Sequence, residues 1–388
     1  MKLTMFFPRP SGAALYRLIQ PLKQIQKHHH VSLLDPERHV TKKEDASYFA
    51  FNILGSDIMF VGYTDLIANE VYDCLMPVND VERKELGHKV NWWVDCDDSI
   101  FGISPYNIGY KDWGLMNFRI IMPSEKEIKW LWKDKEYCEG VPSKDFSISR
   151  NKQNVKRIIK LFKKANVVTT TTEAMRKQLL KYNKNVVVTP NAIDMTIFNA
   201  SKRQRKLDGY FRIGWTFSPS HFPDWFDIRK TLEKFMADNK DCKLVMFSQE
   251  KFGSDIPDDQ IEHYGWTNSH NEYANNMLES GVDVAICPLS DHKFNYFKSP
   301  LKWLEWGSIK IPSIVSKVMY NNHVKHRTDA LVYKTQADLY NQLTELKNNA
   351  ELTKTIGENA YNRIKCEYDI EVVKDKYLQI INDLKTEV

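Results

Sequence analysis

The sequence has no long apolar run, no low-complexity segment and no CxxC pair, and each absence excludes a class of protein. None of its apolar stretches approaches the roughly 20 residues that a membrane-spanning helix needs. The six cysteines lie far apart, which argues against a zinc site and against a disulfide framework. Residues 1–7 are followed at once by Pro8 and are too short for a signal-peptide core. We therefore expect a cytoplasmic protein without a transmembrane segment.

The composition is that of a globular protein with a mild positive charge. Hydrophobic residues make up 42% and charged residues 27% of the chain, which excludes a disordered or fibrous protein. At 388 residues the chain is longer than one ordinary domain, so two domains are expected. A net charge of +5 suits an anionic partner. It does not distinguish a nucleotide from a nucleic acid or a membrane surface.

Short β-rich runs alternate with helical patterns along almost the whole chain. The runs lie at residues 3–7, 31–34, 57–61, 89–94, 166–171 and 186–188, and again at 211–215, 243–247, 282–286 and 312–315. This alternation predicts the α/β class, with parallel sheets built from βαβ units. The pattern restarts after a polar stretch at residues 201–209, and the chain ends in two predicted amphipathic helices, at about residues 336–368 and 369–384.

We therefore predict two Rossmann-like, doubly wound domains that face each other across a cleft. Residues 1–198 form the N-terminal domain and residues 199–368 the C-terminal domain, while a final helix at 369–388 packs back toward the first. Ligands of such open sheets bind at the carboxyl ends of the strands. The active site is therefore expected among the loops at those ends.

Several of these loops, taken in chain order, resemble a known family. The motifs are Ser-Gly-Ala-Ala-Leu-Tyr-Arg at 11–17, Asp-Cys-Asp-Asp at 95–98, Thr-Pro-Asn-Ala-Ile-Asp at 189–194, Ile-Gly-Trp-Thr-Phe-Ser-Pro-Ser-His at 213–221 and Lys-Ser-Pro-Leu-Lys-Trp-Leu-Glu at 298–305. Together they resemble the GT-B glycosyltransferases of the family 4 type, over residues 3–360. The resemblance implies a GT-B fold and transfer of a hexose or pentose from a nucleotide-sugar to an acceptor hydroxyl, with retention of configuration.

The resemblance also implies what the enzyme binds. The donor, most simply a UDP-sugar, would be held mainly by the C-terminal domain. No cofactor and no essential metal are expected, because enzymes of this fold generally use helix dipoles and basic side chains instead. The acceptor could be a glycan, a lipid or a protein hydroxyl. It could also be a hydroxymethylated pyrimidine of DNA, as for phage enzymes of this fold, in which case the chain works in the host cytoplasm.

The segment 298–305 has the features of a diphosphate site. Ser299 lies just before a predicted helix whose first residue is Pro300, a helix-start signal, and a helix N-terminus attracts phosphate. Lys298 and Lys302 stand beside that start and are our candidates for stabilising charge on the leaving diphosphate. By resemblance, Glu305 binds the ribose hydroxyls. The alternative is an i,i+3 surface salt bridge between Lys302 and Glu305.

The sequence departs from the family at one position. Relatives carry a second Glu eight residues before the one that binds ribose, and here that position holds Phe297. The departure puts the identity of the sugar in doubt, and it makes a non-catalytic nucleotide-sugar or glycan-binding protein a third possible function.

Further donor-binding candidates lie in two loops. Ser218, Ser220 and His221 follow a predicted strand and suit a phosphate oxygen or the sugar, unless they only form a turn before the next helix. Gly12 permits close approach of the backbone to a ligand.

The candidates for acceptor binding lie in the N-terminal domain. Asp97 is the candidate base, and Asp95 and Asp98 are crowded beside it. One of these carboxylates could instead cap the next segment. Arg17 could reach phosphate or acceptor, or form a surface salt bridge. Trp130 and Trp132 lie in a stretch that mixes tryptophan with lysine.

Residues 150–164 contain seven basic residues and no acidic one, with apolar residues at helical spacing. The basic face of such a helix suits nucleic acid through phosphate contacts. It suits anionic lipid headgroups equally well, and a solvated helix face is the third interpretation.

Overall fold

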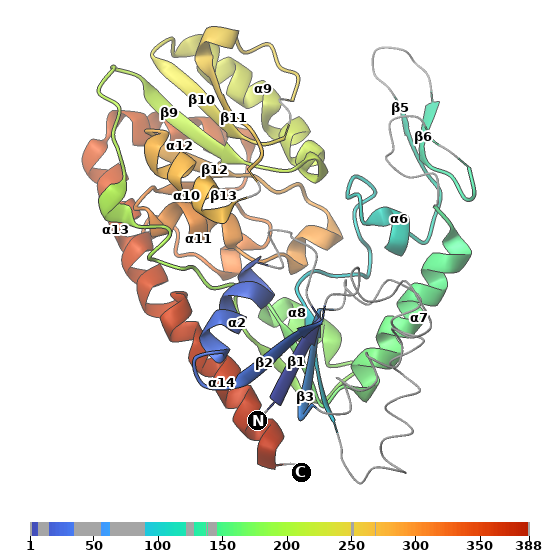
Figure 1. Ribbon diagram of the computed structural model, residues 1–388. Coiled ribbons are helices and arrows are strands. Elements are labelled where there is room, and N and C mark those ends of the chain that lie inside the picture. The colour runs from blue at the N-terminus through green and yellow to red at the C-terminus, as the bar shows by residue number, and fades with distance from the viewer. Residues whose placement is uncertain are drawn as a thin grey trace. The chain divides into compact units, whose positions relative to one another are not determined.

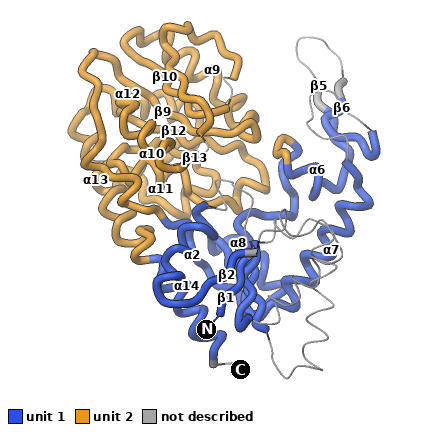
Figure 2. The backbone as a smooth tube through the Cα atoms, in the orientation of Figure 1, with its two compact units in different colours: residues 1–105, 109–192, 373–388 blue, residues 106–108, 193–372 orange. Residues whose placement is uncertain are grey.

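The structure is a computed structural model that describes residues 2–6, 15–34, 56–62, 90–121, 128–136, 138, 146–249, 252–267 and 269–386. The chain forms two compact units, shown in different colours in Figure 2. Unit 1 comprises residues 1–105, 109–192 and 373–388, and unit 2 comprises residues 106–108 and 193–372.

Unit 1 contains a six-stranded sheet in which every strand pair is parallel (Figure 1). The strands in spatial order are β2 (His30–Leu34), β1 (Lys2–Phe6), β3 (Ile58–Gly62), β4 (Asn91–Cys96), β7 (Val167–Thr170) and β8 (Val186–Val188). β3 and β4 are buried along their whole length, as expected for central strands that are covered on both faces.

The other elements of unit 1 are short helices, one long helix and a two-stranded ribbon. They are η1 (Leu15–Ile19), α2 (Gln20–Ile25), α6 (Tyr110–Trp113), α7 (Ile148–Lys164), α8 (Glu173–Leu179) and the antiparallel pair β5 (Phe118–Ile121) and β6 (Ile128–Trp132). Helix α14 (Ile370–Thr386) begins in unit 2 and contributes its residues from 373 onward to unit 1. There Tyr377 is fully buried, with its ring 5.8 Å from that of Trp93.

Unit 2 contains a second parallel sheet of six strands. In spatial order these are β11 (Ile261–Tyr264), β10 (Cys242–Phe247), β9 (Phe211–Thr216), β12 (Val284–Cys287), β13 (Ser313–Ser316) and β14 (Leu331–Tyr333). Numbered along the chain, this order is 3-2-1-4-5-6, the doubly wound arrangement of Rossmann folds. The direction of winding reverses between β9 and β12, which is where such sheets bind their ligands.

Among the described residues of unit 2, four α-helices each follow a strand, and a fifth, α13, comes before α14 returns the chain to unit 1. The helices are η3 (Ala200–Lys202), η4 (Pro219–His221), α9 (Phe222–Asp238), η5 (Asp258–Gln260), α10 (His270–Glu279), η6 (Lys293–Phe297), α11 (Leu301–Ser308), η7 (Tyr320–Asn322), α12 (Gln336–Asn348) and α13 (Ala350–Glu367). Gly214 in β9 lets α11 approach the sheet, because a Cβ there would lie only 2.9 Å from the ring of Trp306.

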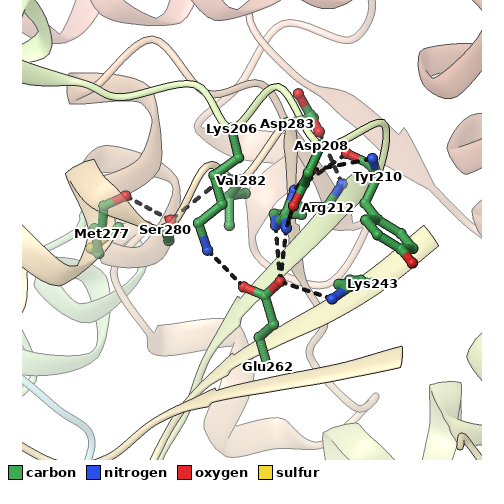
Figure 3. Close-up of polar contacts among 10 residues, drawn as sticks. All are labelled: Lys206, Asp208, Tyr210, Arg212, Lys243, Glu262, Met277, Ser280, Val282 and Asp283. Atoms are coloured by element: carbon green, nitrogen blue, oxygen red, sulfur yellow. Dashed lines mark hydrogen bonds and ion pairs between the residues drawn. The ribbon is translucent and has the colours of Figure 1, made fainter. Parts of the chain in front are cut away.

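A polar network closes the amino-terminal edge of this second sheet (Figure 3). The buried guanidinium of Arg212 lies between Asp208 and Glu262, at 2.5 Å and 2.9 Å. Lys206 and Lys243 also approach Glu262, at 2.9 Å and 3.6 Å. The network ties residues 206–212 to the sheet, at the edge opposite to the carboxyl ends of the strands.

The α/β class and the two parallel sheets are confirmed. Each of the ten β-rich runs coincides with a strand. The single helix expected at residues 336–368 is wrong, because Asn349 ends α12 and caps α13, accepting a hydrogen bond from the Leu352 N–H at 2.9 Å. No helix in the described part of the chain combines the length and apolar character needed to cross a bilayer.

Candidate functional site

The candidate site in unit 2 lies where the strand order reverses. The chain leaves β9 through Ser218 and then forms η4, which contains Ser220, and α9; the hydroxyls of Ser218 and Ser220 are 2.8 Å apart. It leaves β12 through Ser290 toward η6 and α11. Because β9 and β12 are parallel neighbours, their carboxyl ends bring the starts of α9 and α11 to the same edge of the sheet. This is the general position of a ligand site in such folds.

His221 and Asp224 join the two loops at that edge. His221 Nδ1 lies 2.5 Å from Asp224 Oδ2. The other carboxylate oxygen of Asp224 accepts a hydrogen bond from the Ser290 N–H at 2.7 Å. A buried carboxylate on α9 therefore fixes both the imidazole after β9 and the loop after β12.

The amino group of Lys302, in the first turn of α11, faces the same imidazole. Its Nζ atom is 3.3 Å from Nδ1 and 3.2 Å from Nε2 of His221. The nearly equal distances show that the ammonium is not aligned with a single lone pair of the ring. Lys302 therefore acts on His221 mainly through its charge.

This arrangement shifts the pKa values of all three groups. Burial and the charge of Lys302 lower the pKa of His221 to about 4, despite the opposing effect of Asp224. Burial lowers the pKa of Lys302 to about 8. Burial acts to raise the pKa of Asp224, but its contacts with His221 and Lys302 outweigh it and keep that pKa low. At neutral pH the imidazole is thus neutral, and an ionised Asp224 requires the proton on Nδ1.

The start of α11 differs by one residue from the expected one. The helix begins at Leu301 with Pro300 as its N-cap, whereas Pro300 was expected as the first helical residue. Lys298 ends η6 with its ammonium 4.8 Å from the centre of the Phe294 ring. Ser299 lies between the two helices, and Phe297, at the departure from the family motif, is half-buried.

Glu305 is buried one turn deeper in α11 and is held by a residue that the sequence did not single out. The phenol of Tyr273, on α10, donates a hydrogen bond to Glu305 Oε2 at 3.1 Å. The expected set Lys298, Ser299, Lys302 and Glu305 thus occupies one short segment beside His221. Sequence reasoning assigned no role to Asp224 or Tyr273, the polar partners of His221 and Glu305.

In unit 1, Arg17 and Asp95 form a buried ion pair. Arg17 donates to both carboxylate oxygens of Asp95, from Nη2 at 2.5 Å and from Nε at 3.1 Å, and to the hydroxyl and carbonyl of Thr189. Thr169 donates a further hydrogen bond to Asp95 at 2.6 Å. Arg17 is 1% and Asp95 3% exposed. The pair is neither the surface salt bridge considered for Arg17 nor an exposed acceptor contact, and its polar atoms are already used within the protein.

Asp97 and Asp98 stand just beyond the end of β4 and are both half-buried. Burial, together with the charges of Asp98 and Asp95, raises the pKa of Asp97 to about 7. The backbone carbonyl of Asp97 accepts a hydrogen bond from the Thr171 hydroxyl at 3.1 Å. A carboxyl group that titrates near neutrality at a strand end has the properties of a general base.

The two tryptophans of the ribbon have different environments. Trp132 is 3% exposed, packs against Tyr110 and Phe146, and donates from Nε1 to the Pro105 carbonyl at 2.7 Å. It is therefore a core residue of this part of unit 1. Trp130 is 38% exposed, with the ammonium of Lys133 5.8 Å from its ring centre. Gly12 lies outside the described residues.

No group of three or more His, Cys, Asp or Glu side chains suited to a metal ion occurs among the residues that the structure describes. Beside the carboxylates of Asp224 and Glu305, the site in unit 2 gathers the ammonium of Lys302 and two helix starts, which suit an anionic ligand.

The sequence matches no protein-family model and no curated protein. Solved structures nevertheless share its fold. HepE of Anabaena, in complex with UDP and glucose, is 11% identical with a TM-score of 0.63, over 98% of this chain and 99% of that one. Sucrose-phosphate synthase of Thermosynechococcus elongatus is 12% identical with a TM-score of 0.63, over the whole of both chains. A glycosyltransferase from Rickettsia africae is 11% identical with a TM-score of 0.62, over 100% and 99%. The chain therefore has the GT-B fold, with two Rossmann-like domains.

Proposed function

We propose that this protein is a glycosyltransferase that binds a nucleoside diphosphate-sugar at the carboxyl edge of the unit 2 sheet. The observation that carries the proposal is the convergence of Lys302 and His221 at the starts of α11 and α9. Two helix starts and the ammonium of Lys302, which stays mostly protonated at neutral pH with its pKa of about 8, provide the positive potential that a diphosphate requires. The neighbour HepE is described in complex with UDP-glucose, which supports a UDP-sugar as the donor.

In this proposal the diphosphate lies against Lys298, Ser299 and Lys302. The hydroxyls of Ser218 and Ser220 face it from the loop after β9. Glu305, oriented by Tyr273, accepts hydrogen bonds from the ribose. No carboxylate from position 297 contacts the sugar, because that residue is Phe297.

Catalysis would consist of positioning and of stabilising the charge that grows on the departing diphosphate. Lys298 and Lys302 supply this stabilisation. The family 4 resemblance implies retention of configuration, with the leaving diphosphate helping to deprotonate the acceptor. Asp97 is the candidate base in unit 1, because its pKa of about 7 lets it accept a proton at neutral pH.

A thermal-shift screen of nucleoside diphosphates and their sugars tests the proposal directly. A ligand that binds only the folded protein raises its melting temperature, so one nucleotide series should stabilise the wild type and fail to stabilise Lys302→Met. Transfer or hydrolysis of the selected donor then separates an enzyme from a binding protein. Stabilisation by a nucleotide-sugar without turnover under any acceptor would favour the non-catalytic alternative, and no stabilisation by any nucleotide would refute the proposed function.

A further inference from the structure

Asn295, in η6, has a buried side-chain amide to which the proposed function gives no role. The residue is 7% exposed. Its Nδ2 atom donates hydrogen bonds to the carbonyl of Ser290 at 3.0 Å and to the hydroxyl of the same residue at 3.1 Å. A carbonyl oxygen only accepts hydrogen bonds, so the amide nitrogen, and not the amide oxygen, must face Ser290. The side chain therefore holds the loop after β12 in one defined orientation.

Through Ser290 this amide reaches the carboxylate that fixes the imidazole of the candidate site. The Ser290 N–H donates to Asp224 Oδ1 at 2.7 Å, and the other carboxylate oxygen of Asp224 lies 2.5 Å from His221 Nδ1. Asn295 thus binds the carbonyl side of Ser290 while Asp224 binds its N–H. Because one peptide segment carries both contacts, a change at Asn295 alters how Asp224 is held.

The backbone of Asn295 contacts a second part of the site. Its carbonyl accepts a hydrogen bond from the Lys298 N–H at 3.3 Å, where η6 ends. Its own N–H donates to the His292 carbonyl at 2.8 Å. The N-cap of α11 comes two residues after Lys298. One buried residue therefore joins the loop after β12 to the segment that leads into α11.

A second buried amide in unit 2 has a purely structural environment. Gln260 is 4% exposed, and its Nε2 atom donates to the carbonyls of Met236, Asn239 and Cys242 at 3.1, 3.0 and 3.1 Å. Cys242 begins β10, so these contacts lie at the amino-terminal edge of the sheet, opposite to the candidate site. Both amides satisfy buried backbone carbonyls. Of the two, Asn295 does so beside residues that hold charged groups of the site.

From these contacts we propose that Asn295 is a positioning residue of the donor site. Its side chain keeps the Ser290 N–H on Asp224, which holds His221, and its carbonyl keeps Lys298 at the end of η6. The inference rests on the proposed function, because that function is what makes these groups a diphosphate site. Leucine resembles asparagine in shape but has no donor, and an ionised aspartate places an acceptor against the Ser290 carbonyl. Neither side chain can replace the amide at neutral pH.

Imidazole spectroscopy of the full-length, nucleotide-free protein tests the positioning directly. With isotope-labelled histidine nitrogens at pH 7, the neutral ring of His221 should show one tautomer, with its proton on Nδ1. We expect Asn295→Leu to give a mixture of both tautomers, because Ser290 no longer holds Asp224. The matched control, Gln260→Leu, should lower the melting temperature while the ring keeps one tautomer. The His221 signal is identified by its loss in His221→Gln.

Asn295→Asp keeps the test decisive if the leucine variant does not fold. Its ionised carboxylate should give mixed His221 tautomers at pH 7. Protonation toward pH 5 should restore a single tautomer, because a protonated carboxyl group again donates to the Ser290 carbonyl. A single tautomer at pH 7 in a folded Asn295 variant would overturn the proposal, as would an equal mixture in Gln260→Leu.

Calorimetry with UDP measures the consequence for the proposed function. We expect Asn295→Leu to weaken UDP binding about tenfold, whereas Gln260→Leu should retain the wild-type affinity. Combined with Asp224→Asn, the loss should be smaller than the product of the two single losses, because both changes act through Asp224. An undiminished affinity in Asn295→Leu, or a loss equal to that product, would overturn the positioning role. Wild-type protein that binds no UDP would instead refute a UDP-sugar donor, and the imidazole spectra would still decide the role of Asn295.

Discussion

The imidazole of His221 lies 2.5 Å from the carboxylate of Asp224, and both belong to the first turn of α9 and the residue before it. Because Asp224 is buried and has a lowered pKa, it holds the proton of His221 on Nδ1 and leaves the lone pair on Nε2. Asp224 is therefore a positioning residue for the proposed donor site.

Removing this carboxylate should change both the rate and its pH dependence. In Asp224→Asn we expect turnover to fall about tenfold at pH 7, because the tautomer of His221 is no longer fixed. Asp224 also raises the pKa of Lys302, so the decline of activity at high pH should move to lower pH in the variant. The measurement is a pH–rate profile, with Asp227→Asn on the exposed face of α9 as the control. An unshifted profile would show that Asp224 is only structural.

Lys302 should be essential for turnover yet costly for stability. Its ammonium is lost as the pH rises through about 8, and activity should fall with it. We expect Lys302→Met to lower kcat by about 100-fold or more, as when one stabilising group is removed from a developing anion. Lys298→Ala should also lower turnover severely while the fold remains intact. Near-wild-type rates in either variant would remove that lysine from the proposed mechanism.

Lys302 raises turnover in this proposal, but it should lower the free energy of unfolding. Its pKa is lower in the folded state than in the unfolded chain, so the unfolded state binds more protons between about pH 8 and 10.5. Stability should therefore rise with pH over that range, and the destabilisation by the buried ammonium is fully present below pH 8. Because the side chain is only half-buried, we expect Lys302→Met to gain roughly 1–2 kcal/mol at pH 7. Urea unfolding at pH 7 and 10 measures this gain.

Glu305 should act on the ribose alone. We expect Glu305→Gln to weaken binding of the donor nucleotide about tenfold, because a charged acceptor of two hydroxyl groups is replaced by a neutral one. Binding of a 2′,3′-dideoxynucleotide, which lacks those hydroxyls, should be equal in the wild type and the variant. The comparison is made by calorimetry, with Tyr273→Phe as a second variant that loosens Glu305 without removing it. An equal loss for both nucleotides would place Glu305 away from the ribose.

Asp97 should produce an inflection near pH 7 in the rate profile if it is the acceptor's base. The folded pKa lies above the unfolded value of 3.8, so stability falls as the pH rises from about 4 to about 7. Asp97→Asn should therefore abolish the inflection and gain roughly 1–3 kcal/mol at pH 8. In Asp98→Asn the inflection should persist at lower pH, because a neighbouring negative charge is removed. An inflection that survives in Asp97→Asn belongs to another group.

Arg17 and Asp95 should contribute to folding rather than to acceptor binding. Breaking a buried ion pair leaves one charge without its partner and costs about 3–5 kcal/mol. We expect Arg17→Met and Asp95→Asn each to lower the free energy of unfolding by this amount, and the double variant to be less destabilised than their sum. Wild-type stability together with a raised KM for acceptor would restore the role expected from sequence.

The strands and the segment 298–305 could be predicted because their signals are local. β9 and β10 are short, mostly apolar runs between turns, and Ser299 with Pro300 is a helix-start pattern. β11 and β14 were missed because Ile261–Tyr264 and Leu331–Tyr333 are short and carry weak signals of this kind. They become strands by pairing with β10 and β13.

The contacts that define the site could not be predicted, because they join residues far apart in the chain. Lys302 meets His221 across 81 positions, and Arg17 meets Asp95 across 78. Spacing along one helix placed Lys302 and Glu305 on a common face, with a salt bridge between them as the alternative, but it gave no indication that Tyr273 binds Glu305. Similarly, Trp132 lies beside exposed Trp130 in sequence, and only the packing of Tyr110 and Phe146 shows that it is a core residue.

Helix α14 is the last element of the chain to be synthesised, although most of it belongs to unit 1, which the chain begins. Its residues from 373 onward belong to unit 1, where Leu384 accepts a hydrogen bond from Asn91 at 2.9 Å and Tyr377 packs on Trp93. On the ribosome these residues emerge after all of unit 2. Unit 2 can thus complete its sheet first. The ring of Trp93 in unit 1 lacks its contact with Tyr377 until α14 has been synthesised. Nascent chains released before α14 would expose this aromatic surface to chaperones.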